Sequence, residues 1–374
     1  MSHDQLGPLP ALLHHRSGDV VAVVTPVGDK MWLVRDYALA RLVLTDKRFS
    51  RAEAVKPHAP QTNDAQPVAD SIMSMDGADH ARLRRIIAGS FTTGKVATMA
   101  PKIEQSVDRH LDAIAAYGPG ADLIGGLAAP LPLSVLCSLL GVPTGDSGRF
   151  RDWVEVLFDI SASSPREKAR NRLELTRYMA QLIERKRQEP GEDLISTLIA
   201  AHGRGELSAA ELITMGLALL MAGYETTVGQ IGLSVLMLLT DMSERPDSVT
   251  AFVEESLRLS PSTPLSFSRI ALETVTLGEV TVQAGEGVVV SLLDANRDSK
   301  VFIDPTAPQP GHLTFGHGPH RCPGAPLARL QVQIAVERLL HRFPTLRLAA
   351  GPDPVVVWKE GLATRGLSRL AVRW

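Results

Sequence analysis

Short apolar runs near the start of the chain give way to a long stretch with helical periodicity. The runs Val20–Val24 and Met31–Val34 flank the turn-forming segment 26–29, and this arrangement predicts a β-hairpin. From Tyr37 to about Ala251 apolar residues recur mostly with the period of an α-helix. Clusters of Pro, Gly and Ser predict the breaks between these helices, at 118–120, 143–145, 163–165 and 190–191.

The rest of the chain mixes helical, strand and loop patterns. From Val275 to Leu292 short β-rich runs alternate with turns, residues 325–343 return to a helical pattern, and Val355–Trp374 is typical of closing strands. Residues 52–75 are polar and without period, which predicts a long loop, and such loops are often functional. We therefore predict one domain over residues 1–374, mainly α with a smaller β portion (α+β).

Composition and charge narrow the class of protein. The 374 residues are 44% hydrophobic and 21% charged, which allows a sizeable core. The net charge of −2 gives no reason to expect nucleic acid or an anionic membrane as a partner. The apolar stretch Leu212–Ala222 is too short to span a bilayer. With two cysteines and no signal-peptide pattern, we expect a cytoplasmic protein without a disulfide framework.

One of the two cysteines lies in a glycine-rich segment. The sequence Phe315-Gly-His-Gly-Pro-His-Arg-Cys322-Pro-Gly324 allows a tight loop, and a predicted helix follows at once. The N-terminal end of a helix and the adjacent Arg and His all favour a thiolate at Cys322. A small buried cysteine is the simpler alternative. Zinc held by His317, His320 and Cys322 is a second alternative, although zinc needs a fourth ligand.

The pattern FGxGxHxCxG resembles the haem-binding loop of the cytochrome P450 family at every fixed position. The resemblance implies haem b with Cys322 as the axial thiolate, His320 in contact with a propionate, Phe315 beside the sulfur, and Gly324 in the cofactor site. Pro323 has no N–H, so one possible hydrogen bond to the sulfur is missing.

A second motif lies in the middle of a long predicted helix. Ser208 and Glu211 form a capping box at its start, and the apolar pattern continues to about Thr240. Glu225 and Thr226 lie inside this helix, where a carboxylate is costly unless it is solvated or hydrogen-bonded. A local kink and a proton relay are both compatible with that placement.

This segment, AGYETT, resembles the AGxETT signature of the same family. The resemblance implies that Thr226 stabilises the activated dioxygen and that Glu225 helps to deliver protons. The small residues Ala222 and Gly223 leave room over the face of a haem.

Three further segments match family motifs in the same order along the chain. By themselves they are consistent with a surface ion pair and a solvated basic helix face. Glu255 and Arg258 resemble the ExxR pair, to which we assign a folding role. His80, Arg84 and Arg269 resemble residues that hold the haem propionates. Segments 240–250 and 299–314 depart from the family pattern, which leaves their local packing open.

The resemblance implies a monooxygenase that takes O2 and an organic small molecule. The chain carries no flavin or nicotinamide motif, so electrons are expected from a separate ferredoxin and its reductase. Oxidative coupling, ring formation and peroxide-driven oxidation are alternatives within the family. A non-catalytic haem sensor or carrier is a further alternative, but such a protein would not need the acid–alcohol pair.

The substrate is expected to be medium-sized and hydrophobic or amphipathic, in secondary metabolism by family analogy. The enzyme is expected to be a monomer. The side chains predicted to line its pocket are mostly apolar: Leu219, Gly223, Pro264, Leu265 and Leu362.

Overall fold

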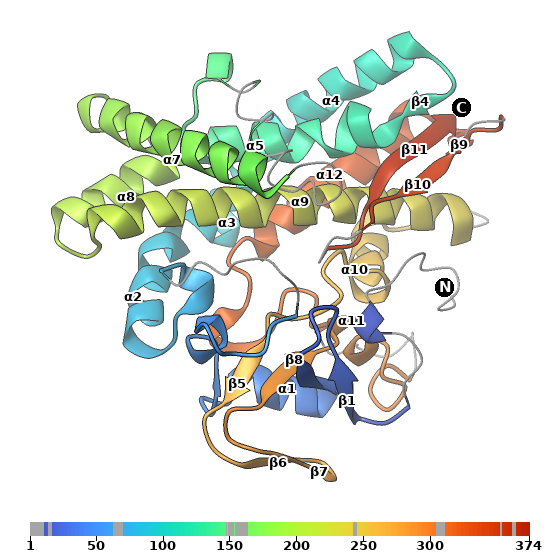
Figure 1. Cartoon of the computed structure of the whole chain (residues 1–374). Coiled ribbons are helices and arrows are strands. Elements are labelled where there is room, and N and C mark those ends of the chain that lie inside the picture. The colour runs from blue at the N-terminus through green and yellow to red at the C-terminus, as the bar shows by residue number, and fades with distance from the viewer. Residues whose placement is uncertain are drawn as a thin grey trace. The chain divides into compact units, whose positions relative to one another are not determined.

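The chain forms two compact units, each made of two chain segments (Figure 1). The computed structural model describes residues 11–13, 17–62, 70–146, 148, 153, 164–241, 245–303, 311–351, 354–360 and 364–374. Unit 1 comprises Met1–Ala81 and Glu255–Cys322, and unit 2 comprises Arg82–Glu254 and Pro323–Trp374. Helices dominate and strands are fewer, as the sequence predicts.

Unit 1 contains a five-stranded sheet in the order β1-β2-β8-β5-β3 and a separate β6-β7 hairpin. Its strands are β1 (Val20–Val24), β2 (Lys30–Val34), β3 (Phe49–Ser50), β5 (Arg269–Ala271), β6 (Val275–Leu277), β7 (Val280–Val282) and β8 (Gly287–Val290). Its helices are α1 (Tyr37–Thr45), α11 (Leu292–Ala295) and the 3-10 turns Ala11–Leu13, Glu53–Val55, Ile72–Ser74 and Gly318–His320.

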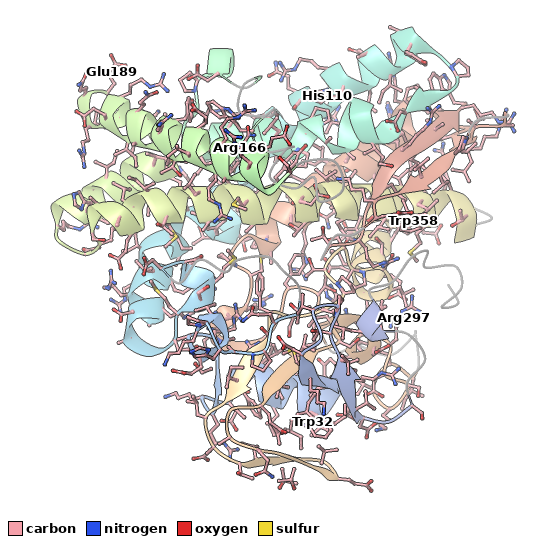
Figure 2. All side chains as sticks on the ribbon, in the orientation of Figure 1. Trp32, His110, Arg166, Glu189, Arg297 and Trp358 are labelled. Atoms are coloured by element: carbon pink, nitrogen blue, oxygen red, sulfur yellow. The ribbon has the colours of Figure 1, made fainter. Side chains whose placement is uncertain are left out.

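The core of unit 1 forms around the central strand β8. The predicted hairpin is confirmed, since β1 pairs with β2 in antiparallel register from Val20–Val34 to Val24–Lys30. β8 pairs with β2 in parallel and with β5 in antiparallel register, and all four of its residues are buried. A continuous Val run is what a strand covered on both faces requires. The sheet carries Trp32 (Figure 2), and the indole N–H of this residue donates to Glu286 at 2.7 Å.

Unit 2 is mostly helical. Its helices are α3 (Thr93–Ala97), α4 (Ala100–Tyr117), α5 (Pro130–Leu140), α7 (Pro165–Gln188), α8 (Leu194–Gly203), α9 (Ala209–Asp241) and α12 (Ala325–Arg342), with the π-helix Ile124–Ala128 and the 3-10 turns Gly89–Phe91 and Thr144–Asp146. Its strands are β4 (Ala121–Asp122), β9 (Arg347–Leu348), β10 (Val356–Trp358) and β11 (Leu367–Arg373), of which β11 pairs with the other three. The helices α2 (Gly77–Ala88) and α10 (Val249–Leu259) cross the boundaries between the units.

The long helix α9 confirms the prediction from Ser208 to Thr240 to within one residue at each end. The Ser208 hydroxyl accepts from the Glu211 N–H at 3.1 Å, and the Glu211 carboxylate accepts from the Ser208 N–H at 2.7 Å. These two bonds are the predicted capping box. The 33 residues span about 50 Å. α9 contacts α5, α7, α8 and α12, and every residue from 227 to 238 is buried.

The stretch Leu212–Ala222 is too short to cross a bilayer by itself, but it belongs to a longer apolar span, Ala209–Thr240, that is long and apolar enough by length and composition alone. However, 56% of its most apolar window is buried within the protein. Burial of this kind is typical of a core helix in a soluble protein.

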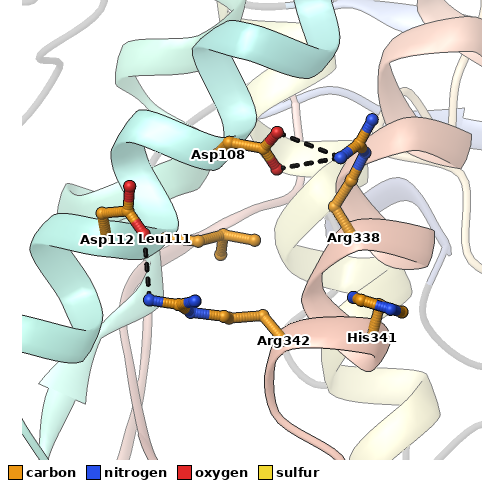
Figure 3. A pocket seen from close by; sticks show the side chains of 6 residues that line it. All are labelled: Asp108, Leu111, Asp112, Arg338, His341 and Arg342. Carbon is orange, nitrogen blue, oxygen red and sulfur yellow. Dashed lines mark hydrogen bonds and ion pairs between the residues drawn. The ribbon is translucent and has the colours of Figure 1, made fainter.

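Ion pairs cross the exposed face between α4 and α12 (Figure 3). Arg338 bonds Asp108 at 3.0 Å, and Arg342 bonds Asp112 at 2.9 Å. These side chains line a surface pocket. Because its charged groups already pair with one another, this pocket is a poor match for an apolar substrate.

The predicted loop 52–75 is only partly irregular. Two 3-10 turns, Glu53–Val55 and Ile72–Ser74, lie within it, and residues 63–69 are outside the described part of the chain. A three-residue turn has no periodicity that a sequence pattern can reveal.

Candidate active site

Cys322 ends a loop in unit 1 that is shaped by glycine. Its N–H donates to the Phe315 carbonyl at 2.8 Å, and the Gly316 N–H donates to the Leu313 carbonyl at 2.7 Å. Gly316 and Gly318 both have φ of +71°, a conformation that side chains other than glycine rarely adopt. A Cβ on Gly318 would also lie 2.8 Å from the Leu44 carbonyl oxygen. The loop therefore needs its glycines.

The two cysteines have different environments. Cys137 is buried in α5, and this burial raises the pKa of its thiol to about 11. Cys322 is exposed, and neither residue forms a disulfide. An exposed thiol that follows a tight loop is accessible to a ligand, whereas Cys137 is a small core side chain.

The zinc alternative finds no support. Within the described ranges, no three His, Cys, Asp or Glu side chains come together so as to hold a metal ion. His317 instead accepts from Arg41 Nε at 3.3 Å. Burial, followed by the charges of Arg41 and Arg321, lowers the pKa of His317.

Four cationic or potentially cationic side chains of unit 1 gather around one carboxylate. Arg51 and Arg269 are only 5% and 4% exposed, and His80 is 4% exposed. The rings of His80 and His320 lie 4.1 Å apart, and His320 Nε2 is 3.4 Å from an oxygen of Asp76.

Asp76 is held by several donors at once. It accepts from the Ser50 hydroxyl at 2.6 Å and from the Ala52 N–H at 2.9 Å, in addition to its contact with His320. Burial alone would raise the pKa of this carboxyl, but these hydrogen bonds outweigh burial and hold the pKa well below its usual range. Asp76 is therefore ionised at neutral pH.

Burial has the opposite effect on the two arginines, because it lowers their pKa values. Burial lowers the pKa of Arg51 to about 10, with a further contribution from the charge of Arg269, and burial lowers the pKa of Arg269 to about 10 as well. Arg51 donates to the Met73 and Ser268 carbonyls, and Arg269 lies 3.4 Å from the Phe267 carbonyl.

This set of donors fits an anionic ligand. The two buried guanidinium groups of Arg51 and Arg269 lie near the carboxylate of Asp76, whereas burial lowers the pKa of His320 despite its contact with Asp76. A buried charge is costly unless it is paired, so the cluster favours further carboxylates. The two propionates of haem b match this requirement.

The predicted ExxR pair forms in unit 1. Arg258 donates to both oxygens of Glu255, with Nε at 2.8 Å, and to the Asn296 carbonyl at 2.7 Å. The buried Asn296 accepts from the Leu313 N–H at 2.6 Å and donates to the Thr314 hydroxyl at 2.8 Å. The pair therefore connects to the chain segment that leads into the Cys322 loop.

The middle of α9 in unit 2 has an accessible side. Ala222 is exposed and Gly223 and Thr226 are half-buried, although neighbouring residues along the helix are buried. The Thr226 hydroxyl donates to the Ala222 carbonyl at 2.8 Å, and the Thr227 hydroxyl donates to the Gly223 carbonyl at 2.8 Å. These bonds to the preceding turn are the expected ones for Thr inside a helix, and α9 continues through them without a break.

Glu225 is buried and paired. Its carboxylate accepts from Lys359 Nζ at 2.6 Å, and only 3% of its side chain is exposed. Burial raises the pKa of Glu225, against the opposing effect of the Lys359 ammonium. The ion pair with Lys359 thus offsets the free energy that is needed to bury a carboxylate inside this helix.

The other predicted residues have varied surroundings. Arg84 is half-buried on α2, one turn after His80. Gly324 is the N-cap of α12 with φ of −78°, so its backbone does not require glycine. Leu219 is 9% exposed. Pro264 is buried, Leu265 packs partly buried on the core of unit 1, and Leu362 is outside the described residues.

Sequence patterns do not single out three residues of these clusters: Arg51, Asp76 and Lys359. None belongs to a short motif, and their partners lie far away in the sequence. A carboxylate at Asp76, directly before the start of α2, was the one available signal.

Comparisons with known proteins agree on one family. Residues 241–355 match the family model described as cytochrome P450. The chain is 41% identical over 362 residues to nocardicin C N-oxygenase of Nocardia uniformis subsp. tsuyamanensis, covering 93% of this chain and 91% of that protein. It is 38% identical to mycinamicin IV hydroxylase/epoxidase of Micromonospora griseorubida, covering 95% and 92%.

A solved structure gives the same result at the level of the fold. The LnmA cytochrome P450 hydroxylase from the leinamycin biosynthetic pathway of Streptomyces atroolivaceus superposes with a TM-score of 0.88 at 38% identity, and the match covers 98% of each chain.

Proposed function

Because this chain belongs to the cytochrome P450 family, we propose that it inserts one oxygen atom from O2 into a medium-sized hydrophobic or amphipathic small molecule. Members of the family bind haem b, and this chain is a haem-dependent monooxygenase of that family. The observation that carries the proposal is the cluster of buried basic side chains around Arg51 and Arg269 in unit 1. Unit 1 also contains the exposed Cys322, at the end of a loop that needs its glycines.

Cys322 would ligate the haem iron as a thiolate, with Phe315 beside the sulfur. Arg269, His80, Arg84 and His320 would hold the propionates by charge-assisted hydrogen bonds. When bound, haem supplies the iron centre at which O2 is reduced and cleaved, and a thiolate ligand favours that cleavage.

The accessible side of α9 would serve the oxygen chemistry. The Thr226 hydroxyl can rotate from the Ala222 carbonyl toward a new acceptor, because a hydroxyl holds one donor and a backbone carbonyl is a replaceable partner. Glu225 would supply protons as a general acid, for which its raised pKa is suited. Ala222 and Gly223 would leave space above the cofactor.

The proposed class of substrate is based on the apolar side chains proposed to contact it and on the substrates that the relatives' names state. Leu219, Gly223 and Leu265 would contact the substrate. The named relatives act on nocardicin C and mycinamicin IV, so a tailoring reaction on a secondary metabolite is the best-supported role. We further propose a cytoplasmic monomer that receives electrons from a separate ferredoxin and its reductase, without membrane or nucleic acid.

The proposal can be tested with purified enzyme, a surrogate ferredoxin system and a set of secondary-metabolite scaffolds. Compounds that shift the haem absorption from low to high spin are then turned over under isotopically labelled O2. We expect a product that contains one labelled oxygen atom, and no such product from the Cys322→Ser variant.

Two results would contradict the proposal. A coupled or cyclised product without the label would assign the enzyme to oxidative coupling. Product formation that continues with peroxide but never with O2 and the ferredoxin system would assign it to peroxide-driven oxidation.

A further inference from the structure

The buried acid of α9 has a charged partner near the C-terminal strands. Lys359 directly follows β10, and its Nζ lies 2.6 Å from Glu225 Oε1, 134 residues away in sequence. The Glu225 side chain is 3% exposed and the Lys359 side chain is 25% exposed. The lysine therefore connects a buried carboxylate to a more solvent-accessible position.

Close packing of glycine on glycine brings the two elements together. A Cβ on Gly366 would lie 3.3 Å from the Cα of Gly229, which is one helical turn beyond Glu225 on α9. The Lys359 N–H donates to the Gly366 carbonyl at 3.0 Å, so this contact also fixes the backbone of the lysine. Nearby Trp358 lies on β10 (Figure 2), and the guanidinium of Arg365 lies 5.7 Å from the centre of its ring.

Glu225 and Thr226 face different directions. Consecutive residues of an α-helix are separated by about 100° around the axis. Thr226 lies on the accessible side of α9, with its hydroxyl on the Ala222 carbonyl, whereas Glu225 is buried against Lys359. The ion pair thus holds the acid away from the side on which the alcohol lies.

The charge balance at Glu225 depends on this lysine. Burial raises the pKa of the carboxyl and Lys359 lowers it through both its charge and its hydrogen bond. The segment from β10 to β11 also carries Glu360, Arg365 and Arg369, and α12 carries further charges, but the charged group that lowers the pKa of Glu225 against the effect of burial is Lys359.

We propose that Lys359 is a positioning residue for proton delivery: it holds the Glu225 side chain on the β10–β11 side of α9 as a carboxylate, and it thereby sets the pH range in which Glu225 can act as an acid. This inference rests on the proposed role of Glu225 as the proton donor. The proton that Glu225 gives up is replaced from solvent, and Lys359 is the part of the pair that solvent reaches.

Infrared difference titration of the resting enzyme tests the ionisation without any substrate. The band of the protonated Glu225 carboxyl is identified by its absence in Glu225→Gln. In Lys359→Met the midpoint of this band should move up by at least about one pH unit, because a cation within 4–6 Å lowers a carboxyl pKa by roughly 1–3 units. Lys359→Arg keeps the charge and should stay within about 0.5 unit of the wild type.

Turnover with the ferredoxin system provides the second readout. Proton donation requires the protonated acid, so product formed per O2 should fall as pH rises through the pKa of Glu225. In Lys359→Met this fall should move to higher pH, by the same interval as the infrared midpoint. The ferrous–CO spectrum confirms that each variant binds haem, and Lys359→Gln replaces Lys359→Met if the latter does not fold.

The outcomes separate the inference from the function on which it rests. An infrared midpoint that does not move in Lys359→Met overturns the inference, and so does a midpoint that moves while the pH profile of turnover stays fixed. If Glu225→Gln turns over with an unchanged pH profile, the proposed acid role of Glu225 itself is wrong.

Discussion

Replacement of Asn296 by Ala should destabilise the protein by removing two buried side-chain hydrogen bonds. Asn296 is fully buried, and its side chain joins the Leu313 N–H at 2.6 Å and the Thr314 hydroxyl at 2.8 Å. Thr314 keeps its bond to the Leu257 carbonyl at 2.7 Å. Leu313, however, is 2% exposed, and its N–H loses its acceptor.

The expected loss follows from these two bonds. An unsatisfied buried donor costs about 1–3 kcal/mol, and loss of one ordinary hydrogen bond costs about 0.5–1.5 kcal/mol. We expect Asn296→Ala to lower the free energy of unfolding by about 2–4 kcal/mol. The same change should loosen the segment 311–316, which leads to Cys322, so a larger fraction of the protein should lose the haem–thiolate spectrum.

Urea unfolding followed by circular dichroism measures the stability, and the slope m should stay unchanged. Amide hydrogen exchange at Leu313 reports the local effect and should become faster by at least about tenfold, which corresponds to ~1.4 kcal/mol. Thr276→Ala, at an exposed position of β6, is the control and should change stability by no more than about 0.5 kcal/mol. If Asn296→Ala lowers the free energy of unfolding by less than about 0.5 kcal/mol, the assigned role of these bonds is refuted.

Three further predictions concern the cofactor and its chemistry. Thr226→Ala should retain haem but lower product formed per electron pair by at least about tenfold, with peroxide released instead; unchanged coupling would indicate another proton route. Arg269→Leu should speed haem transfer to apomyoglobin, with affinity weaker by roughly 10- to 100-fold, since a hydrogen bond to a charged group contributes about 1.5–3 kcal/mol. The exposed Arg48→Leu is its control and should leave haem transfer unchanged. Pro323→Leu restores an N–H beside the sulfur and should raise the iron potential by about 40 mV for a net bond of ~1 kcal/mol; an equal or lower potential would refute this.

The sequence predicted the long elements well because their signals are local. A capping box and an apolar run defined α9, and alternating apolar residues around a Gly turn defined the β1–β2 hairpin. Both signals come from neighbours within a few residues, which a sequence pattern displays directly. The strands of two residues, β3, β4 and β9, were missed because they exist only through pairing with distant partners.

The residues of the candidate site also fall into those that a local sequence motif reveals and those that only the folded chain reveals. Cys322, His320, Glu225 and Thr226 lie in short motifs of fixed spacing, so the amino-acid sequence is enough to single them out. Lys359 differs, because its role depends on an ion pair across 134 positions that only the folded chain creates.

Asp76 and Arg51 were missed for the same physical reason. Asp76 takes its donors from two separate segments, residues 50–52 and His320, and Arg51 is buried beside Arg269, more than 200 residues away in the chain. Charged residues of this kind look like ordinary surface positions in a sequence. Their burial becomes visible only when the fold is known.

The central claim is that Cys322 is the ligand of the haem iron. The most direct test is the ferrous–CO spectrum of the purified protein, compared with those of Cys322→Ala and of the matched control Cys137→Ala. We expect the wild type and Cys137→Ala to show the absorption band that gives the family its name, and Cys322→Ala to lose it. Retention of that band in Cys322→Ala would contradict the assignment of the thiolate ligand.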